Sequence, residues 1–282
     1  MPLLMLTSFI WAFSFGLIKK HLAGVDAGFV AFARLGLALA LFLPLLRPRR
    51  IPPAQALRLC AVGGIQFGLM YVFYIQSFRF LDAHQVALFT VFTPILVVLF
   101  ADGMDKRFRP LHFWTAALAV AGTALIVYSG RGRAGIAWGF LLVQVSNACF
   151  ALGQLAYRRL AAAGKIGRDR DIFAWLYLGG AAAALASIPL CNGALVVELS
   201  VTQALVLLYL GLLASGVGFF LWNVGATRVS AGTLAVMNNL KVPLAVTVSL
   251  LVFAERTNLI RLALGGGAVL LALFLNEKDK AQ

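Results

Sequence analysis

The chain has 282 residues, of which 62% are hydrophobic and only 12% are charged, whereas soluble domains carry about 25% charged residues. One water-soluble core could not bury so much apolar surface, so the composition indicates an integral membrane protein. The formal net charge of +14 does not imply a nucleic-acid partner, because the Lys and Arg residues lie at the ends of apolar segments, as in membrane proteins.

Ten apolar segments, each near the roughly 20 residues that a bilayer requires, are predicted to form transmembrane helices. In chain order they are residues 3–18, 28–46, 59–78, 83–101, 111–129, 136–157, 172–190, 203–223, 231–253 and 258–275. The first segment precedes the basic pair Lys19 and Lys20 instead of following a basic stretch, so we expect an uncleaved helix and not a signal peptide. The connections are short and leave no room for a soluble domain.

The basic residues predict the orientation of these helices. With a cytoplasmic N-terminus, the cytoplasmic connections and the C-terminal tail carry 15 Lys and Arg residues, and the opposite connections carry 7. Positive charge is concentrated on the cytoplasmic side of membrane proteins. We therefore expect both termini in the cytoplasm, which requires an even number of helices and agrees with ten.

Two segments 149 residues apart match each other, which indicates an internal repeat. The alignment of SFRFLDAHQVALFTVFTPILVV with ATRVSAGTLAVMNNLKVPLAVT places Arg79 on Arg228 and Pro94 on Pro243. A proline inside a helix removes one hydrogen bond and can kink the helix. We expect Pro94 and Pro243 to act as a pair of hinges, although prolines are common in membrane helices and either one alone has that simpler explanation.

The repeat divides the chain into a first five-helix unit, residues 1–130, and a second five-helix unit, residues 135–282. Because five is odd, the second unit must enter the membrane from the opposite side. The prediction is an all-α integral membrane protein with ten helices in two inverted repeats, an architecture typical of transporters that bind substrate near the midplane. The alternative is duplication without transport, with the glycines serving only helix packing.

The most deeply placed charge is Lys241, about ten residues from either end of its predicted helix. Asn238 shares a helix face with it, and Asn239 lies beside them. No Asp or Glu lies comparably deep, and a buried ammonium group needs an anionic partner or loses its proton. We expect the substrate's carboxylate to be this partner; the alternatives are helix carbonyl groups or a water-filled cleft.

Other side chains in the predicted helices are candidates for a substrate cavity with amide donors and aromatic walls. They are Trp11, Gln66, Tyr74, Gln144, Asn147, Trp222 and Asn223. Each one alone is explained as well by a hydrogen bond between helices or by an aromatic residue at the membrane interface. Arg34, near the end of its predicted helix, is expected to snorkel to the interface in a structural role.

No enzymatic, metal-binding or nucleotide-binding motif occurs in the sequence. The chain lacks a phosphate-binding glycine loop, an HExxH pair and a nucleophile elbow, which argues against an enzyme and against ATP-driven transport. Cys60, Cys149 and Cys191 have no metal-ligand spacing and are expected to be packing residues. We therefore expect no catalytic residue, metal, cofactor or partner protein.

Several strings resemble the EamA branch of the drug/metabolite transporter superfamily, and they occur in both halves of the chain. They are WAFSF (11–15), LFTVFTP (88–94), LLVQVSN (141–147), FAWLYLG (173–179), ASGVGFFLWNVGAT (214–227) and AGTLAVMNN (231–239). The resemblance implies a secondary transporter of a small carboxylated metabolite in the bacterial inner membrane. The biotin-carrying members of the branch imply import of biotin by alternating access.

Biotin would present a carboxylate to Lys241 and a ureido ring to the amides of Asn147 and Asn238. Two alternatives stay open on the sequence alone. One is export of amino acids or other amphipathic metabolites, the commoner activity in the EamA branch. The other is a membrane scaffold or enzyme without transport activity.

Overall fold

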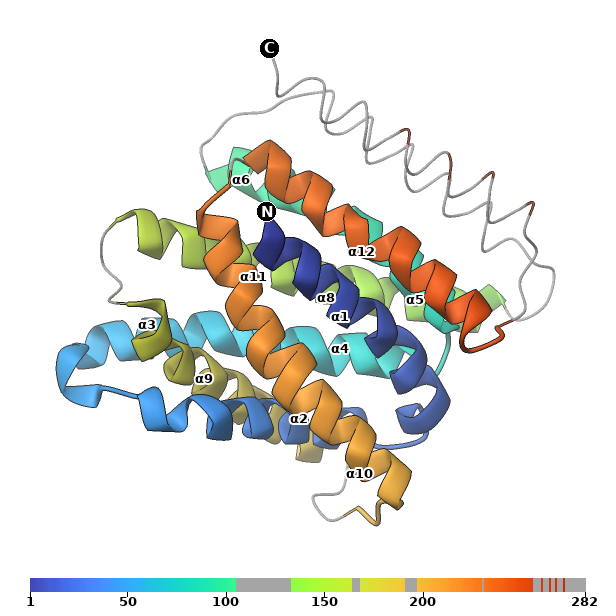
Figure 1. Ribbon diagram of the computed structural model, residues 1–282, viewed down its shortest axis with the longest axis horizontal. Helices are drawn as coiled ribbons and strands as arrows, with labels where there is room; N and C mark the ends of the chain where they lie inside the picture. The colour runs from blue at the N-terminus through green and yellow to red at the C-terminus, as the bar shows by residue number, and fades with distance from the viewer. Residues whose placement is uncertain are drawn as a thin grey trace.

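The computed structural model is all-helical over the residues that it describes, which are 1–104, 133–163, 168–190, 197–229 and 231–255, with isolated helical positions at 260, 264, 267 and 271. The helices run lengthwise between two ends of a bundle (Figure 1). Seven helices in this part of the chain are long and apolar enough to cross a membrane. The protein is therefore a multi-pass membrane protein.

The described helices of the first half form four consecutive passes along the bundle. Their bounds are α1 (Pro2–Leu17), η1 (Ile18–Leu22), α2 (Ala27–Phe42), η2 (Leu43–Leu45), η3 (Pro48–Arg50), α3 (Pro53–Gly63), η4 (Gly64–Leu69), α4 (Met70–Ser77), α5 (Ala83–Phe89), η5 (Thr90–Phe92) and α6 (Thr93–Met104). The described helices of the second half are α8 (Arg133–Ala162), α9 (Asp169–Leu190), α10 (Val201–Leu208), η6 (Tyr209–Val217), α11 (Gly218–Thr227) and α12 (Ala231–Leu251).

Eight of the ten predicted segments coincide with described helices. The other two, residues 111–129 and 258–275, lie outside the described residues apart from the isolated helical positions in the second. The third segment begins earlier than predicted, at Pro53, because proline is well suited to the first position of a helix. Large apolar side chains such as Phe9 and Leu205 stay exposed on the bundle, as expected where lipid is the solvent.

Glycine residues bring helices α3 and α9 into direct backbone contact. A Cβ atom added to Gly63 would lie 1.9 Å from the carbonyl oxygen of Leu176, and one added to Gly179 would lie 1.9 Å from that of Cys60. Helices in lipid gain little from the hydrophobic effect and associate through close packing of this kind. The contact joins a helix of the first half to a helix of the second.

Candidate substrate-binding site

A cavity lies between helices α1, α2, α4, η5, α6, α8, α11 and α12, so both halves of the chain contribute to its wall. Four of the predicted site residues line the cavity: Trp11, Tyr74, Asn147 and Lys241. The described lining also contains aromatic rings, hydroxyl groups and a second cation, Arg34, and it contains no carboxylate.

Lys241 lies within α12 and is 7% exposed. Its Nζ is 5.4 Å from the centroid of the Trp11 ring and 5.5 Å from that of Phe150, distances at which a cation and an aromatic face attract each other. Ring faces replace only part of the hydration that a buried ammonium group loses. The arrangement leaves Lys241 able to pair with an anionic group of a ligand.

Arg34 lies in the cavity wall, so the prediction that it snorkels to the membrane interface is wrong. Its side chain is only 2% exposed, and two polar groups inside the bundle accept hydrogen bonds from it in place of water. Nη2 donates a hydrogen bond to Tyr71 Oη at 2.7 Å, and Nε donates to Ser215 Oγ at 3.2 Å. The guanidinium carbon also lies 4.0 Å from the centroid of the Tyr71 ring.

Carbonyl groups of the π-helical segment η6 accept hydrogen bonds from aromatic side chains in and near the cavity wall. Its wider turns leave carbonyls that side chains can reach, and such segments are frequent at functional sites. The oxygen of Ala214 accepts a hydrogen bond from Trp11 Nε1 at 2.8 Å. Tyr177 Oη donates to the carbonyls of Ser215 at 2.9 Å and Gly216 at 2.7 Å. The Ala214 contact fixes the Trp11 ring in its place beside the cavity, and the Tyr177 contacts hold η6 against α9.

Asn147 faces the cavity, but its amide group already has protein partners. Its Nδ2 donates to the carbonyl of Phe89 at 2.9 Å and to Gln144 Oε1 at 3.2 Å, and its Oδ1 accepts from Thr93 Oγ1 at 3.1 Å. Phe89 is the last residue of α5, and η5 separates α5 from α6 just before Pro94. Because proline has no N–H and disrupts the preceding turn, side chains must satisfy carbonyls at this break.

The second proline of the predicted pair lies in a different local structure. Pro243 is inside α12, which is helical without interruption from Ala231 to Leu251. The two prolines therefore match in sequence and differ in their effect on the helix in this conformation.

The remaining predicted residues whose side chains are described do not line the cavity. Gln66 and Asn223 are fully buried and hydrogen-bond each other, with 3.1 Å between Gln66 Nε2 and Asn223 Oδ1. Trp222 is also fully buried and packs against the rings on the far side of the wall. Asn238 is 1% exposed and is not among the described lining residues, while the side chain of Asn239 lies outside the described part of the chain. Gln144 is half-buried, and its Nε2 donates to the carbonyl of Phe89 at 3.4 Å.

Several cavity residues were missed by sequence reasoning, in addition to Arg34. They are Thr93, Ser146, Phe150 and Phe219. A phenylalanine in an apolar segment has no sequence signal that separates a cavity-facing position from a lipid-facing one. Serine and threonine give little more sequence signal for a cavity-facing position, because their hydroxyl groups often bond to carbonyls of their own helix.

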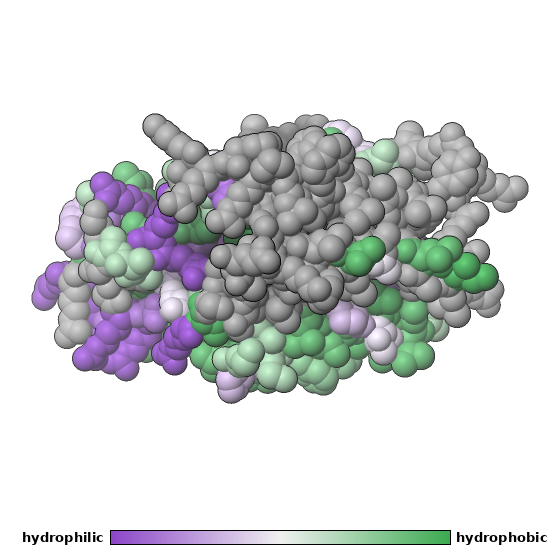
Figure 2. All heavy atoms as spheres, turned by 90° about the horizontal axis from the view of Figure 1, so that it is seen from above, coloured by the Kyte–Doolittle hydropathy of each residue, from purple (hydrophilic) through white to green (hydrophobic). Residues whose placement is uncertain are grey.

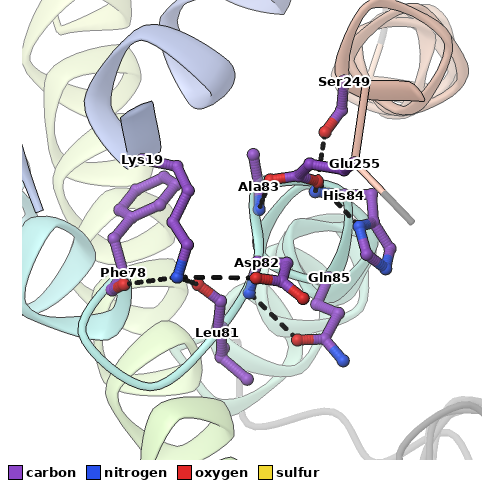
Figure 3. A network of polar contacts seen from close by, with 9 residues as sticks. All are labelled: Lys19, Phe78, Leu81, Asp82, Ala83, His84, Gln85, Ser249 and Glu255. Atoms are coloured by element: carbon purple, nitrogen blue, oxygen red, sulfur yellow. Dashed lines mark hydrogen bonds and ion pairs between the residues drawn. The ribbon is translucent and has the colours of Figure 1, made fainter. Parts of the chain in front are cut away.

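A polar network joins the start of α5 to the chain that follows α12 (Figure 3). The Glu255 carboxylate accepts hydrogen bonds from the backbone N–H of Ala83 at 2.8 Å and of His84 at 3.0 Å. It also pairs with His84 Nδ1 at 2.7 Å and accepts a hydrogen bond from Ser249 Oγ. The first N–H groups of a helix have no partner within it and attract negative charge, so Glu255 fastens α12 to α5.

Lys19 lies in η1, the continuation of α1, and fastens this helix to the same end of the bundle (Figure 3). Its Nζ donates to the carbonyls of Leu81 at 2.9 Å and Phe78 at 3.1 Å, and it lies 3.5 Å from Asp82 Oδ1. Asp82 is the N-cap of α5, and its backbone N–H donates to Gln85 Oε1 at 3.0 Å in a capping box. Helices α1, α4, α5 and α12 are thus tied together at this end.

Replacing Glu255 with Gln is expected to lower stability in a pH-dependent way. Burial alone would raise the pKa of this carboxyl, but its hydrogen bonds from His84, Ser249 and the backbone lower the pKa to about 2, from an ordinary value of 4.5. Because the folded state has the lower pKa, the carboxylate stabilises the fold above about pH 4.5, by up to about 3 kcal/mol. This contribution decreases as the pH falls toward 2.

Thermal unfolding of the detergent-purified protein between pH 2.5 and pH 7.5 measures this effect. We expect the difference between wild type and Glu255→Gln to be constant at neutral pH and to shrink below about pH 4.5. Glu198→Gln, at an exposed position, is the matched control and should match wild type throughout. A Glu255→Gln variant as stable as wild type at pH 7 would contradict the assignment.

The chain was compared with known proteins. It matches the model of the EamA-like transporter family over residues 1–128 and 137–277. It is 41% identical to the "Probable biotin transporter" of Pseudomonas aeruginosa, over 100% of this chain and 99% of the relative, and 37% identical to the "Biotin transporter" of Salmonella typhimurium, over 99% and 93%. The "Aromatic amino acid exporter YddG" of Ancylobacter novellus is 27% identical over 63% of this chain and 60% of its own. A crystal structure with 20% identity superposes with a TM-score of 0.67 over 97% of this chain and 95% of its own, which shows a shared fold.

Proposed function

The chain belongs to the EamA-like transporter family, and on this premise we propose that it imports biotin across the bacterial inner membrane. The observation that carries the proposal is the cavity in which Lys241 lies with no carboxylate among the described lining residues. A substrate carboxylate supplies the missing negative charge. Biotin has one such group, and the full-length relatives named as biotin transporters support this choice of substrate.

The remainder of biotin is also compatible with the cavity. Its fused ring and alkyl chain present apolar surface that would pack against Trp11, Phe150 and Phe219. We propose Lys241, Trp11, Tyr74 and Asn147 as substrate contacts, because their side chains border the cavity. The other candidates from the sequence are left out of the proposed contact set, because those with described side chains do not line the cavity.

We further propose ten transmembrane helices in two inverted repeats, residues 1–130 and 135–282, that operate by alternating access. The two separate stretches matched by the family model support a two-unit chain. The π-helical segments give independent support. Adding the 149-residue offset of the repeat to the bounds of η4 gives residues 213–218, which overlap η6. Pro94 and Pro243 are proposed as hinges at equivalent places in the two units.

Both termini are proposed to lie in the cytoplasm. Figure 2 shows hydrophilic side chains gathered at the left end of the molecule, where the α2–α3 and α8–α9 connections lie in Figure 1. Exposed arginines in these regions include Arg47, Arg49, Arg58, Arg168 and Arg170. Positive charge favours the cytoplasmic face, so we assign this end to it. The proposal involves the lipid bilayer and a small-molecule substrate, with no cofactor, nucleic acid or partner protein.

Export of aromatic amino acids is the second candidate, because the Ancylobacter novellus relative has that name and the cavity has aromatic walls. An amino acid would bring its ammonium group near Lys241 and Arg34, where the described lining has no carboxylate to pair with it. A monocarboxylate avoids this repulsion. The charge of the cavity therefore favours biotin over an amino acid.

The deciding experiment is uptake of radiolabelled biotin at nanomolar concentration by cells that lack their own biotin carrier and biotin synthesis. Saturable uptake that depends on expression of this chain, and that unlabelled biotin suppresses, is the expected result. An excess of unlabelled phenylalanine is the specificity control and should leave uptake unchanged. Absence of uptake with verified protein in the membrane would overturn the biotin assignment.

A further inference from the structure

The hydrogen bonds around Arg34 leave one of its three nitrogens without a partner among the described residues. Ser215 Oγ donates to the carbonyl of Leu210 at 2.7 Å, which uses its only hydrogen. The contact of 2.9 Å between Tyr71 Oη and Ser215 Oγ therefore has Tyr71 as its donor. Both oxygens also accept a hydrogen bond from the guanidinium group, so Tyr71 and Ser215 have no free hydrogen.

This nitrogen is Nη1 of Arg34, which is buried and has no hydrogen-bond partner among the described residues. A guanidinium group stays charged in proteins and carries five N–H donors. Leaving donors of a buried charged group without an acceptor is costly. Since Arg34 lines the cavity, an acceptor on a bound ligand can satisfy Nη1.

The two cations of the cavity contact different rings. Arg34 lies on the ring of Tyr71, and Lys241 lies over those of Trp11 and Phe150. The ring of Phe219 packs against all three, at centroid distances of 5.6 Å, 5.0 Å and 6.1 Å respectively. The two cations thus contact different rings of one aromatic cluster, which suits a ligand with two polar groups and apolar atoms between them.

We propose that Arg34 is a specificity-determining residue that binds the ureido oxygen of biotin through Nη1, while Lys241 binds the carboxylate. This inference rests on the proposed function. Nη1 of Arg34 has no partner among the described residues, and a neutral carbonyl oxygen can accept a hydrogen bond from it. The Lys241 ammonium has only ring faces beside it and suits the full negative charge. Tyr71 and Ser215 act as positioning residues that hold the guanidinium group in place.

Competition with two biotin analogues tests which cation binds which end of the substrate. In 2-iminobiotin the ureido oxygen is replaced by a nitrogen that is protonated at neutral pH, and biotin methyl ester has no carboxylate. We expect each analogue to compete with radiolabelled biotin at least about tenfold more weakly than biotin does in wild type. In Arg34→Gln, the discrimination against 2-iminobiotin should largely disappear and that against the ester should persist. Lys241→Gln should show the reverse.

Tyr71→Phe keeps the arginine and the ring but removes the hydroxyl group that holds Nη2. It serves as the second variant if Arg34→Gln is absent from the membrane, and we expect it to lose several-fold of the discrimination against 2-iminobiotin. Unchanged discrimination in either variant would overturn the inference, as would loss of discrimination against the ester in Arg34→Gln. Failure of wild type to take up biotin would instead overturn the proposed function.

Discussion

Replacing Lys241 with Met is expected to reduce biotin uptake by about 100-fold or more, the largest functional effect that we predict. Methionine has a similar length and keeps the packing against Trp11 and Phe150, but it removes the positive charge. A substrate carboxylate would then enter a cavity that offers it no partner at this end. Removing one partner of a buried ion pair costs about 3–5 kcal/mol, which corresponds to a loss of this size or greater.

The same substitution at an exposed lysine is the matched control for this effect. Lys20 is exposed in η1, and Lys20→Met is expected to leave uptake unchanged. Lys241→Arg keeps the charge with a different shape and should retain part of the activity. Uptake at the wild-type level by Lys241→Met, with equal protein in the membrane, would show that Lys241 does not bind the substrate.

The membrane-spanning helices could be predicted from the sequence because the bilayer sets both their length and their apolarity. Eight of the predicted apolar segments coincide with described helices. The differences are at their ends, as at Pro53, where proline starts a helix before the apolar run begins. The interruption near Pro94 was also within reach, because proline removes a hydrogen bond wherever it lies in a helix. The continuous helix through Pro243 shows that neighbouring contacts decide whether this loss breaks the helix.

The cavity was predicted less completely, because burial depends on contacts between distant parts of the chain. Lys241 could be identified since a charge in the middle of an apolar segment has few structural explanations. Arg34 has the same property, but its position nearer the predicted helix end favoured snorkelling. Its partners Tyr71 and Ser215 are 37 and 181 residues away in sequence, and only the fold brings them to it.

The buried amides show the converse case, polar residues chosen from the sequence that the described cavity wall does not include. Gln66 and Asn223 have the sequence pattern of cavity residues, but they are 157 residues apart and bond to each other. A polar residue that faces a ligand and one that joins two helices look the same in a single sequence. The distinction requires knowing whether another helix supplies a partner, which is a property of the packing and not of the segment.

Substituting Gly63 with Ala is expected to have the largest effect on stability. The added methyl group would lie 1.9 Å from the carbonyl oxygen of Leu176, and this backbone atom cannot move without shifting α9. Overpacking at ordinary core positions costs about 1–3 kcal/mol, and a rigid backbone neighbour places this site at or above the upper end. The expected decrease in melting temperature is about 10 °C or more.

The adjacent Gly64 is the matched control, because the nearest atom to an added Cβ there is 3.5 Å away, an ordinary van der Waals distance. Gly64→Ala makes the same chemical change one residue further along and should melt within about 2 °C of wild type. Gly179→Ala makes the reciprocal clash with the carbonyl of Cys60 and should behave like Gly63→Ala. Detergent melting curves of the three variants separate close backbone contact from a general need for glycine: equal losses at Gly63 and Gly64 would contradict the contact between α3 and α9. Losses at Gly63 and Gly179 alone would show that this contact joins the two halves of the transporter and contributes to its stability.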